Sequence, residues 1–144
     1  MDSAPEVWTL RCDGGARGNP GPAAYGYVLA DSQGVEVEAK GQYLGPATNN
    51  VAEYRGLIAG LEAAARHGAK RLRVYLDAEL VVRQMTGQYR VKNAGLKPLH
   101  EQAQRAAAGF SRIEYRAVPR EGNARADALV NETLDRVQSS ESPR

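Results

Sequence analysis

One stretch near the middle of the chain constrains the fold most, because it predicts the start of a long helix and places a carboxylate close to the core. Asn50 is followed three positions later by Glu53 and then by apolar residues at helical spacing, the pattern of a capping box with Asn50 as N-cap. At about 100° per residue, one apolar stripe follows: Val51, Tyr54, Ile58, Leu61 and Ala65. Glu53 lies at the edge of this stripe, so the helix carries an acid towards the core. The helix is expected to end at His67, with Gly68 as a left-handed cap.

Alternating apolar and polar residues predict strands on both sides of this helix. Before it, strands are expected over residues 7–13, 24–30 and 35–44, separated by a Gly- and Pro-rich loop at 16–22 and a turn at 31–34. After it, strands are expected at 71–76 and 113–117, and helices at 79–85, from Leu99 to Phe110 (apolar Leu99, Ala103, Ala106 and Phe110), and from Asn123 to about Val137. This order predicts an antiparallel meander extended by parallel crossover strands.

The composition indicates one globular domain. With 144 residues, 42% of them hydrophobic, we expect a domain over residues 7–137, a flexible N-terminus at 1–6 and a disordered tail at 138–144. The net charge of +2 permits an anionic partner without requiring one. The single cysteine, Cys12, excludes an internal disulfide framework, and no apolar run approaches the roughly 18 residues of a membrane span. We therefore expect a cytoplasmic monomer with no membrane partner.

Four carboxylates are candidates for one common site: Asp13, Glu53, Asp77 and Asp127. Each has an ordinary explanation when taken alone, as a turn residue, a capping residue, the N-cap of a short helix and a first-turn acid favoured by the helix dipole. Together they form a pattern, because two follow central, adjacent strands and two lie on the inward edges of helices. Carboxylates gathered near a core resist ionisation, so such a cluster needs a compensating charge.

Divalent cations provide that compensation. Oxygen ligands without a His or Cys cluster suit Mg²⁺ or Mn²⁺ rather than zinc. Two such ions roughly 4 Å apart can activate a water and stabilise the leaving oxygen of a phosphodiester. The residues thus predict a metal-dependent nuclease.

Four motifs, in order, resemble those of type 1 ribonuclease H, the family that hydrolyses the RNA strand of RNA–DNA hybrids. They are DGGARGNPGP at 13–22, TNNVAEY at 48–54, DAELVV at 77–82 and GNARAD at 122–127, and the resemblance extends from residue 7 to about 137. It implies an α/β ribonuclease H-like fold, with a five-stranded mixed sheet and helices on both faces. It also implies two Mg²⁺ ions, with Asp13 bridging both, Glu53 and Asp77 completing one site, and Asp127 completing the other.

The resemblance also implies contacts with the hybrid. Distinguishing RNA from DNA requires short polar groups that reach the 2′-hydroxyl from the minor groove. Candidates for this contact are Gly15, Asn19, Asn49, Asn50 and Glu79. Asn123, in the last motif, is also expected to contact the substrate. In this interpretation Asn49 and Asn50 face the minor groove while Glu53 points back to a metal, so capping becomes secondary for Glu53.

Two further segments are candidates for binding the DNA strand. Thr48, with Arg17 and Asn19 of the Gly-rich loop, is placed to hold a phosphate, although a purely structural turn is the alternative. Tyr89 and the basic residues after it resemble the aromatic and basic contacts of the family, although a solvated charged loop is the alternative.

Three features depart from the family pattern. The loop at 119–123 lacks the histidine that many members carry. Arg120 is the expected substitute, as in the short archaeal and actinobacterial members that the chain resembles, and an exposed loop arginine is the alternative. The segment at 86–98 is too short for the basic protrusion of several bacterial members, so hybrid affinity should be modest and salt-dependent. Ala78 stands where a small hydroxyl residue is usual, with no predicted consequence.

The expected activity is endonucleolytic cleavage that leaves 3′-hydroxyl and 5′-phosphate ends. Two alternatives stay open on the sequence alone. One is a hybrid-binding module that has lost most of its turnover, and the other is a nuclease of the same fold that acts on DNA.

Overall fold

The first three strands form the antiparallel meander that the sequence predicts, and two parallel strands extend it on the other side. The computed structural model describes residues 6–141, and within them the strand order is β3-β2-β1-β4-β5. The strands are β1 (Val7–Ala16), β2 (Gly21–Ala30), β3 (Glu36–Ala47), β4 (Arg71–Leu76) and β5 (Arg112–Ala117). Strand β1 pairs antiparallel with β2 and parallel with β4, and β5 pairs parallel with β4. The predicted five-stranded mixed sheet is confirmed.

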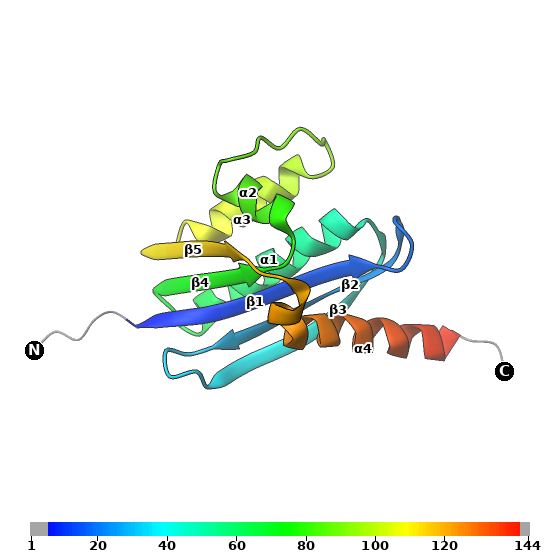
Figure 1. Cartoon of the computed structure of the whole chain (residues 1–144), viewed down its shortest axis with the longest axis horizontal. Helices are drawn as coiled ribbons and strands as arrows, with labels where there is room; N and C mark the ends of the chain where they lie inside the picture. Colours follow the sequence, from blue (N-terminus) through cyan, green and yellow to red (C-terminus); the bar gives the residue numbers. More distant parts are fainter. Residues whose placement is uncertain (1–5, 142–144) are drawn as a thin grey trace, which may run out of the picture.

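Helices cover both faces of this sheet (Figure 1). They are α1 (Asn49–Arg66), α2 (Glu79–Met85), α3 (Lys97–Ala107), the short 3-10 helix η1 (Arg120–Asn123) and α4 (Ala124–Glu141). The larger core lies between the sheet and α1 to α3, where Leu10, Leu57 and Leu61 are fully buried. Each such leucine contributes about 2 kcal/mol by leaving water. A smaller core of Ala24, Val130 and Leu134 lies under α4.

Helix α1 begins two residues earlier than a cap at Asn50 would allow. The N-cap is Thr48, whose Oγ1 accepts a hydrogen bond of 3.2 Å from the amide of Val51. The prediction that Asn50 is the N-cap is therefore wrong, and Glu53 is not at the third helical position of a capping box. This frees the Glu53 carboxylate for a partner outside its own helix.

The end of α1 agrees with the prediction. Gly68 has a φ of +83°, and its amide donates to the carbonyl of Ala65, while the amide of Ala69 donates to the carbonyl of Ala64. These two bonds define a Schellman motif. Ala65 itself is exposed, so the predicted apolar stripe is wrong at its last position, and the buried face turns towards Ala64.

Several predicted boundaries need correction. Strand β1 continues through Asp13 to Ala16, so the irregular part of the Gly-rich loop is only residues 17–20, and β3 continues to Ala47. Helix α3 buries Ala107 instead of Ala106 and ends before Phe110. Helix α4 starts after Asn123 and extends to Glu141, so residues 138–141 are helical instead of forming a disordered tail. The rest of that predicted tail, 142–144, and residues 1–5 of the predicted flexible N-terminus lie outside the described residues. Across residues 6–141, no helix combines the length and the apolar composition that crossing a membrane requires.

Candidate active site

Two of the four candidate carboxylates meet where β4 ends and β1 continues. The parallel pairing of the two strands stops at Arg11 and Tyr75, and β1 then runs on beside β2 alone. Asp13 lies on this extension of β1, and Asp77 directly follows the last residue of β4. The predicted adjacency of the two strands is confirmed, although Asp13 lies inside its strand and not at its end.

Helix α1 delivers the third carboxylate because two glycines let it approach β1 closely. A Cβ at Gly14 would lie 2.2 Å from the carbonyl carbon of Ala52, and one at Gly56 would lie 2.8 Å from the carbonyl oxygen of Asp13. At this short separation, the amide of Gly14 donates a hydrogen bond of 3.2 Å to Oε1 of Glu53. The carboxylate is thus fastened to β1 and turned away from its own helix end.

Asp13, Glu53 and Asp77 form a single acidic cluster, with one oxygen of each within 4.8 Å of the others. Asp13 and Glu53 are only 5% and 7% exposed. Burial raises the pKa of Asp13 to about 7, and repulsion by Asp77 adds to this shift. Burial also raises the pKa of Glu53 well above its ordinary value, reinforced by repulsion from Asp13. Ionising Asp13 and Glu53 together near neutral pH is therefore unfavourable without a compensating positive charge.

The donor atoms of this cluster fit a divalent cation. Oε2 of Glu53 is buried and has no hydrogen-bond partner among the described residues. An unpaired buried carboxylate oxygen is costly, and a metal ion would satisfy it. All three donors are carboxylate oxygens, the ligands that Mg²⁺ and Mn²⁺ prefer.

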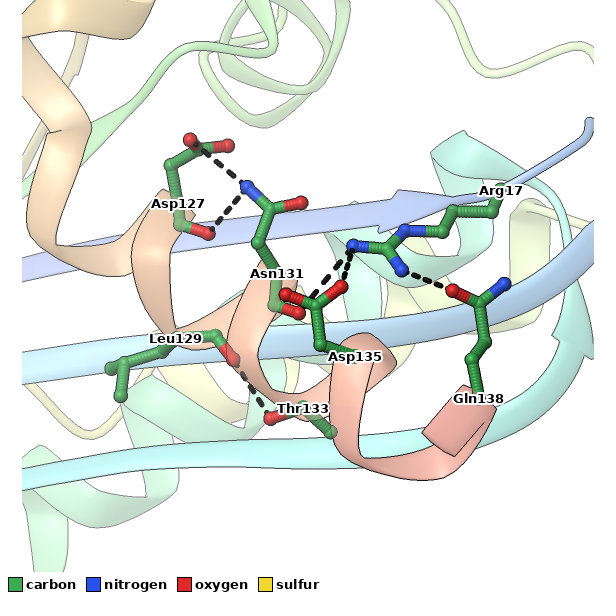
Figure 2. Close-up of polar contacts among 7 residues, drawn as sticks. All are labelled: Arg17, Asp127, Leu129, Asn131, Thr133, Asp135 and Gln138. Atoms are coloured by element: carbon green, nitrogen blue, oxygen red, sulfur yellow. Dashed lines mark hydrogen bonds and ion pairs between the residues drawn. The ribbon is translucent and has the colours of Figure 1, made fainter. Parts of the chain in front are cut away.

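The fourth carboxylate, Asp127, is held at the same cleft by its own helix. It lies in the first turn of α4 and lines the cleft of about 390 Å³ that the other three acids share. It is not one of the three clustered acids, but it is close enough to raise the pKa of Asp13 through a side-chain hydrogen bond. Figure 2 shows the amide of Asn131 reaching back to it, with Nδ2 donating to Oδ2 at 3.3 Å and to the backbone carbonyl at 3.2 Å.

Asn131 is a site residue that the sequence reasoning missed. Its spacing of four residues from Asp127 places both on the same side of α4, which is the signal that could have identified it. The amide fixes one oxygen of the Asp127 carboxylate and leaves the other available to the cleft. Asn131 also lines the cleft itself.

Arg17, a predicted phosphate ligand, is bound to α4 in this structure (Figure 2). Its guanidinium lies 2.7 Å from the carboxylate of Asp135 and 3.5 Å from the carbonyl oxygen of Asn131, and it also donates to Gln138. Arg17 lines the cleft but uses its donors to fasten the β1–β2 loop to the helix that carries Asp127. A phosphate would have to compete with these contacts.

The polar residues around the start of α1 that were predicted to contact the substrate form hydrogen bonds within the protein. Oδ1 of Asn19 accepts from the amide of Asn49 at 3.0 Å, and Oδ1 of Asn49 accepts from the amide of Ala16 at 2.8 Å. Gly15, Asn49 and Asn50 line the cleft. Thr48 caps the helix, so its hydroxyl has a structural partner already.

The loop before α4 places Arg120 beside the acids and Asn123 in the interior. Nε of Arg120 lies 3.7 Å from Oδ2 of Asp77, and its side chain is 77% exposed. Asn123 is only 1% exposed and donates from Nδ2 to the carbonyl of Cys12 at 2.7 Å. In place of the predicted substrate contact, Asn123 therefore braces η1 against β1. Ala78 lines the cleft and precedes α2 without capping it through its side chain.

Glu79 and Tyr89, like Asn19, Thr48 and Asn123, lie outside the lining of the acidic cleft. Glu79 forms an ion pair of 2.6 Å with Arg83 on the surface of α2. Tyr89 is 49% exposed, and the guanidinium of Arg83 lies 5.4 Å from the centre of its ring. The structure brings these residues together with each other, and not with the four acids.

The fold and the acidic cleft together define a domain of the ribonuclease H-like class. Residues 11–133 match a family described as reverse transcriptase-like. The bifunctional protein Rv2228c of Mycobacterium tuberculosis is 51% identical over 133 residues, which cover 91% of this chain and 36% of that protein. The solved structure of its N-terminal RNase H domain, fused to maltose-binding protein, superimposes with a TM-score of 0.91 at 46% identity and covers 95% of this chain and 99% of that one.

Two further relatives have related names. Ribonuclease HI of Halobacterium salinarum is 46% identical over 123 residues, covering 85% of this chain and 62% of that protein. The structure of LC11-RNase H1 in complex with an RNA/DNA hybrid superimposes with a TM-score of 0.84 at 41% identity and covers 90% of this chain and 98% of that one. The chain belongs to the type 1 ribonuclease H family. It spans about a third of the length of the mycobacterial relative.

Proposed function

We propose that the chain is a metal-dependent endonuclease that cleaves the RNA strand of RNA–DNA hybrids and leaves 3′-hydroxyl and 5′-phosphate ends. The observation that carries this proposal is the cluster of Asp13, Glu53 and Asp77, in which one buried carboxylate oxygen has no hydrogen-bond partner within residues 6–141. The likeness to LC11-RNase H1, whose structure contains an RNA/DNA hybrid, supports the choice of substrate.

The four carboxylates would hold two Mg²⁺ ions, with Mn²⁺ as a possible substitute. In this proposal Asp13, Glu53 and Asp77 hold one ion, and Asp13 and Asp127 hold the other. Bound ions of this kind supply an activated water and stabilise the leaving oxygen. The protein itself orients and tunes these ligands. The Gly14 amide fixes the direction of the Glu53 carboxylate, and the burial of Asp13 and Glu53 favours the binding of a positive charge.

Arg120 takes a different role from the histidine that many family members carry. A guanidinium has hydrogen-bond donors and no acceptor, so it cannot accept and release a proton as imidazole does. Its position beside Asp77 and its 77% exposure allow it to swing to a phosphate. We assign Arg120 to neutralising phosphate charge during cleavage or product release.

Recognition of RNA would come from the cleft wall formed by Gly15, Asn49 and Asn50. A Cβ at Gly15 would have its nearest neighbours 3.9 Å away, so this position leaves space for a sugar to approach the backbone. Amide groups of asparagine can donate to and accept from a 2′-hydroxyl, which DNA lacks. Glu79, Tyr89 and the segment after it would contact the hybrid beyond the cleft.

The proposal is tested by incubating the protein with end-labelled RNA–DNA hybrid, double-stranded RNA and duplex DNA, each with Mg²⁺, Mn²⁺ or a chelator. Cleavage of only the RNA strand of the hybrid, abolished by the chelator, is the expected result. Cleavage of duplex DNA would favour a same-fold DNA nuclease, and binding of hybrid without cleavage would favour a binding module.

We also propose that the protein acts as a monomer in the cytoplasm, a reducing compartment that suits its single buried thiol, Cys12. Size-exclusion chromatography checks the monomer.

A further inference from the structure

A second charged surface lies on the sheet, outside the lining of the acidic cleft. Strand alternation turns Leu10, Leu72 and Val74 towards the α1 core, so the residues between them face the opposite side. That side of β1, β4 and β5 carries five arginines, here called the arginine face: Arg11, Arg71, Arg73, Arg112 and Arg116. One acid, Glu114, lies among them.

The arginine face is open to solvent. Helix α4 packs on β2, on β3 and on part of β1, and in the described part of the chain no helix lies over the corresponding side of β4 and β5 (Figure 1). The side chains of Arg73 and Arg116 are 40% and 54% exposed although each has an ionic partner. A polyanion could therefore reach this side of the sheet without any rearrangement of helices.

The charges on this face are unbalanced. Glu114 is shared between Arg73 and Arg116, at 3.0 Å from each. Arg71 and Arg112 have no acidic partner within residues 6–141. Five arginines against one glutamate give +4 on the arginine face, whereas the whole chain carries only +2. Positive charge is thus concentrated here and not spread over the surface.

A shallow hollow of about 150 Å³ lies within the arginine face. Three arginines line it, Arg71, Arg73 and Arg112, together with Val7, Leu72 and Glu114. Planar guanidinium groups that converge on a small hollow match the geometry of a phosphate, which accepts two hydrogen bonds from each group.

We propose that the arginine face binds the phosphate backbone of nucleic acid that extends beyond the segment in the acidic cleft. The strands β1 and β4 run from this face towards Asp13 and Asp77, and Arg11 donates to the carbonyl of Gly122 in η1 at 2.9 Å. The two surfaces therefore border each other across η1. Alternate residues of a strand are about 6.6 Å apart, similar to the spacing of successive phosphates along an extended strand. The choice of nucleic acid over an acidic protein rests on the proposed function of the neighbouring cleft.

The contact should be independent of base sequence. Tyr75 lies between Arg11 and Arg116 at one end of the arginine face, and the guanidinium of Arg11 covers its ring at 4.5 Å from the ring centre. The ring is therefore not free to stack on a base from that side, and phosphate contacts dominate.

The test compares the double variant Arg71→Gln/Arg112→Gln with the matched control Arg55→Gln/Arg105→Gln, which removes the same charge from exposed positions on α1 and α3. Fluorescence anisotropy in chelator measures binding of a short hybrid and of the same hybrid carrying either a duplex DNA or a single-stranded RNA extension. We expect the first variant to lose the extra affinity for extended hybrids. Raising the salt concentration fourfold should weaken wild-type binding to extended hybrids about tenfold more than it weakens this variant, because two phosphate contacts are missing.

The other arms separate the possible explanations. Arg71→Lys/Arg112→Lys keeps the charge and should keep most of the salt dependence of wild-type binding. If the Gln variant instead lost affinity through a folding defect, restoring the charge with lysine would not recover this salt dependence. Equal affinities of the Gln variant and the control for extended hybrids would overturn the proposal and leave an acidic protein as the remaining type of partner. Cleavage of the short hybrid with Mg²⁺ reports on the proposed function separately, since neither double variant touches the cleft.

Discussion

Replacing Asp13 by asparagine should stabilise the metal-free protein at neutral and alkaline pH. The Asp13 carboxyl is buried, and burial together with repulsion from Asp77 raises its pKa from 3.8 to about 7. The ionised form is thus disfavoured in the folded state relative to the unfolded chain. Asparagine has nearly the same shape and carries no charge, so it removes the penalty while filling the same space.

The magnitude follows from the two pKa values. Between about pH 4 and pH 7 the folded wild type holds a proton that the unfolded chain has lost, so the free energy of unfolding falls as the pH rises and becomes constant above pH 7. At about 1.4 kcal/mol per pH unit, the ceiling of this loss is about 4 kcal/mol. Water in the open cleft screens part of the interaction, which leaves an expected gain of about 2–3 kcal/mol for Asp13→Asn at pH 8 and little at pH 4.

Thermal melting in chelator at pH 4.5 and pH 8 measures this difference. A gain of 2–3 kcal/mol corresponds to a rise in Tm of about 6–10 °C for a domain of this size. Added Mg²⁺ should raise the Tm of the wild type more than that of the variant, because the ion compensates the charge that asparagine lacks. Glu101→Gln, on the exposed side of α3, serves as a charge-matched control. A Tm difference that does not change with pH would refute the electrostatic account of the cluster.

Three further substitutions test separate parts of the site. Gly14→Ala would bring a Cβ within 2.2 Å of the α1 backbone and should lower the free energy of unfolding, measured in urea, by about 3 kcal/mol or more. Gly15→Ala, whose Cβ would have its nearest neighbour at 3.9 Å, should lower it by less than about 1 kcal/mol. Equal losses would contradict the close approach of α1 to β1. Asn131→Ala should lower kcat about tenfold with KM and Tm nearly unchanged, because only the orientation of the Asp127 carboxylate is lost. A fall in Tm that accompanies the loss of kcat would indicate a purely structural role for Asn131. Arg120→Ala should lower kcat about tenfold without changing the pH profile between 6.5 and 8, and the loss of a titrating limb would contradict a charge-neutralising arginine.

The positions of the acids could be predicted from the sequence because they depend on strand order. An antiparallel meander followed by crossover strands makes β1 and β4 neighbours, so Asp13 and Asp77 come together without knowledge of any side-chain contact. Glu53 in the second turn of α1 and Asp127 in the first turn of α4 then line the same cleft. Patterns of period two and 3.6 carry this information directly.

The N-cap of α1 could not be chosen from the sequence. Thr48, Asn49 and Asn50 are adjacent, and all three residue types cap helices well. The choice depends on tertiary contacts, because Asn49 is used to hold the amide of Ala16 and Glu53 is drawn to Gly14. Capping propensity alone predicts neither of these two contacts.

The ends of β1 and α4 escaped prediction for a similar reason. Glycine is depleted in strands, so Gly14 and Gly15 indicate a stop, yet β2 pairs with both, and the approach of α1 requires a residue without a side chain at Gly14. The polar end of α4 contains Gln138, which accepts from Arg17 of a loop 121 positions away in the chain. Only the folded arrangement brings these partners together.

Cleavage of an end-labelled RNA–DNA hybrid by the wild type and by Asp13→Asn, with hybrid binding measured in parallel, tests the central claim most directly. We expect Mg²⁺-dependent cleavage of the RNA strand by the wild type, none in chelator, and none by Asp13→Asn although the variant still binds the hybrid. Turnover retained by Asp13→Asn would contradict a catalytic centre built on the acidic cluster.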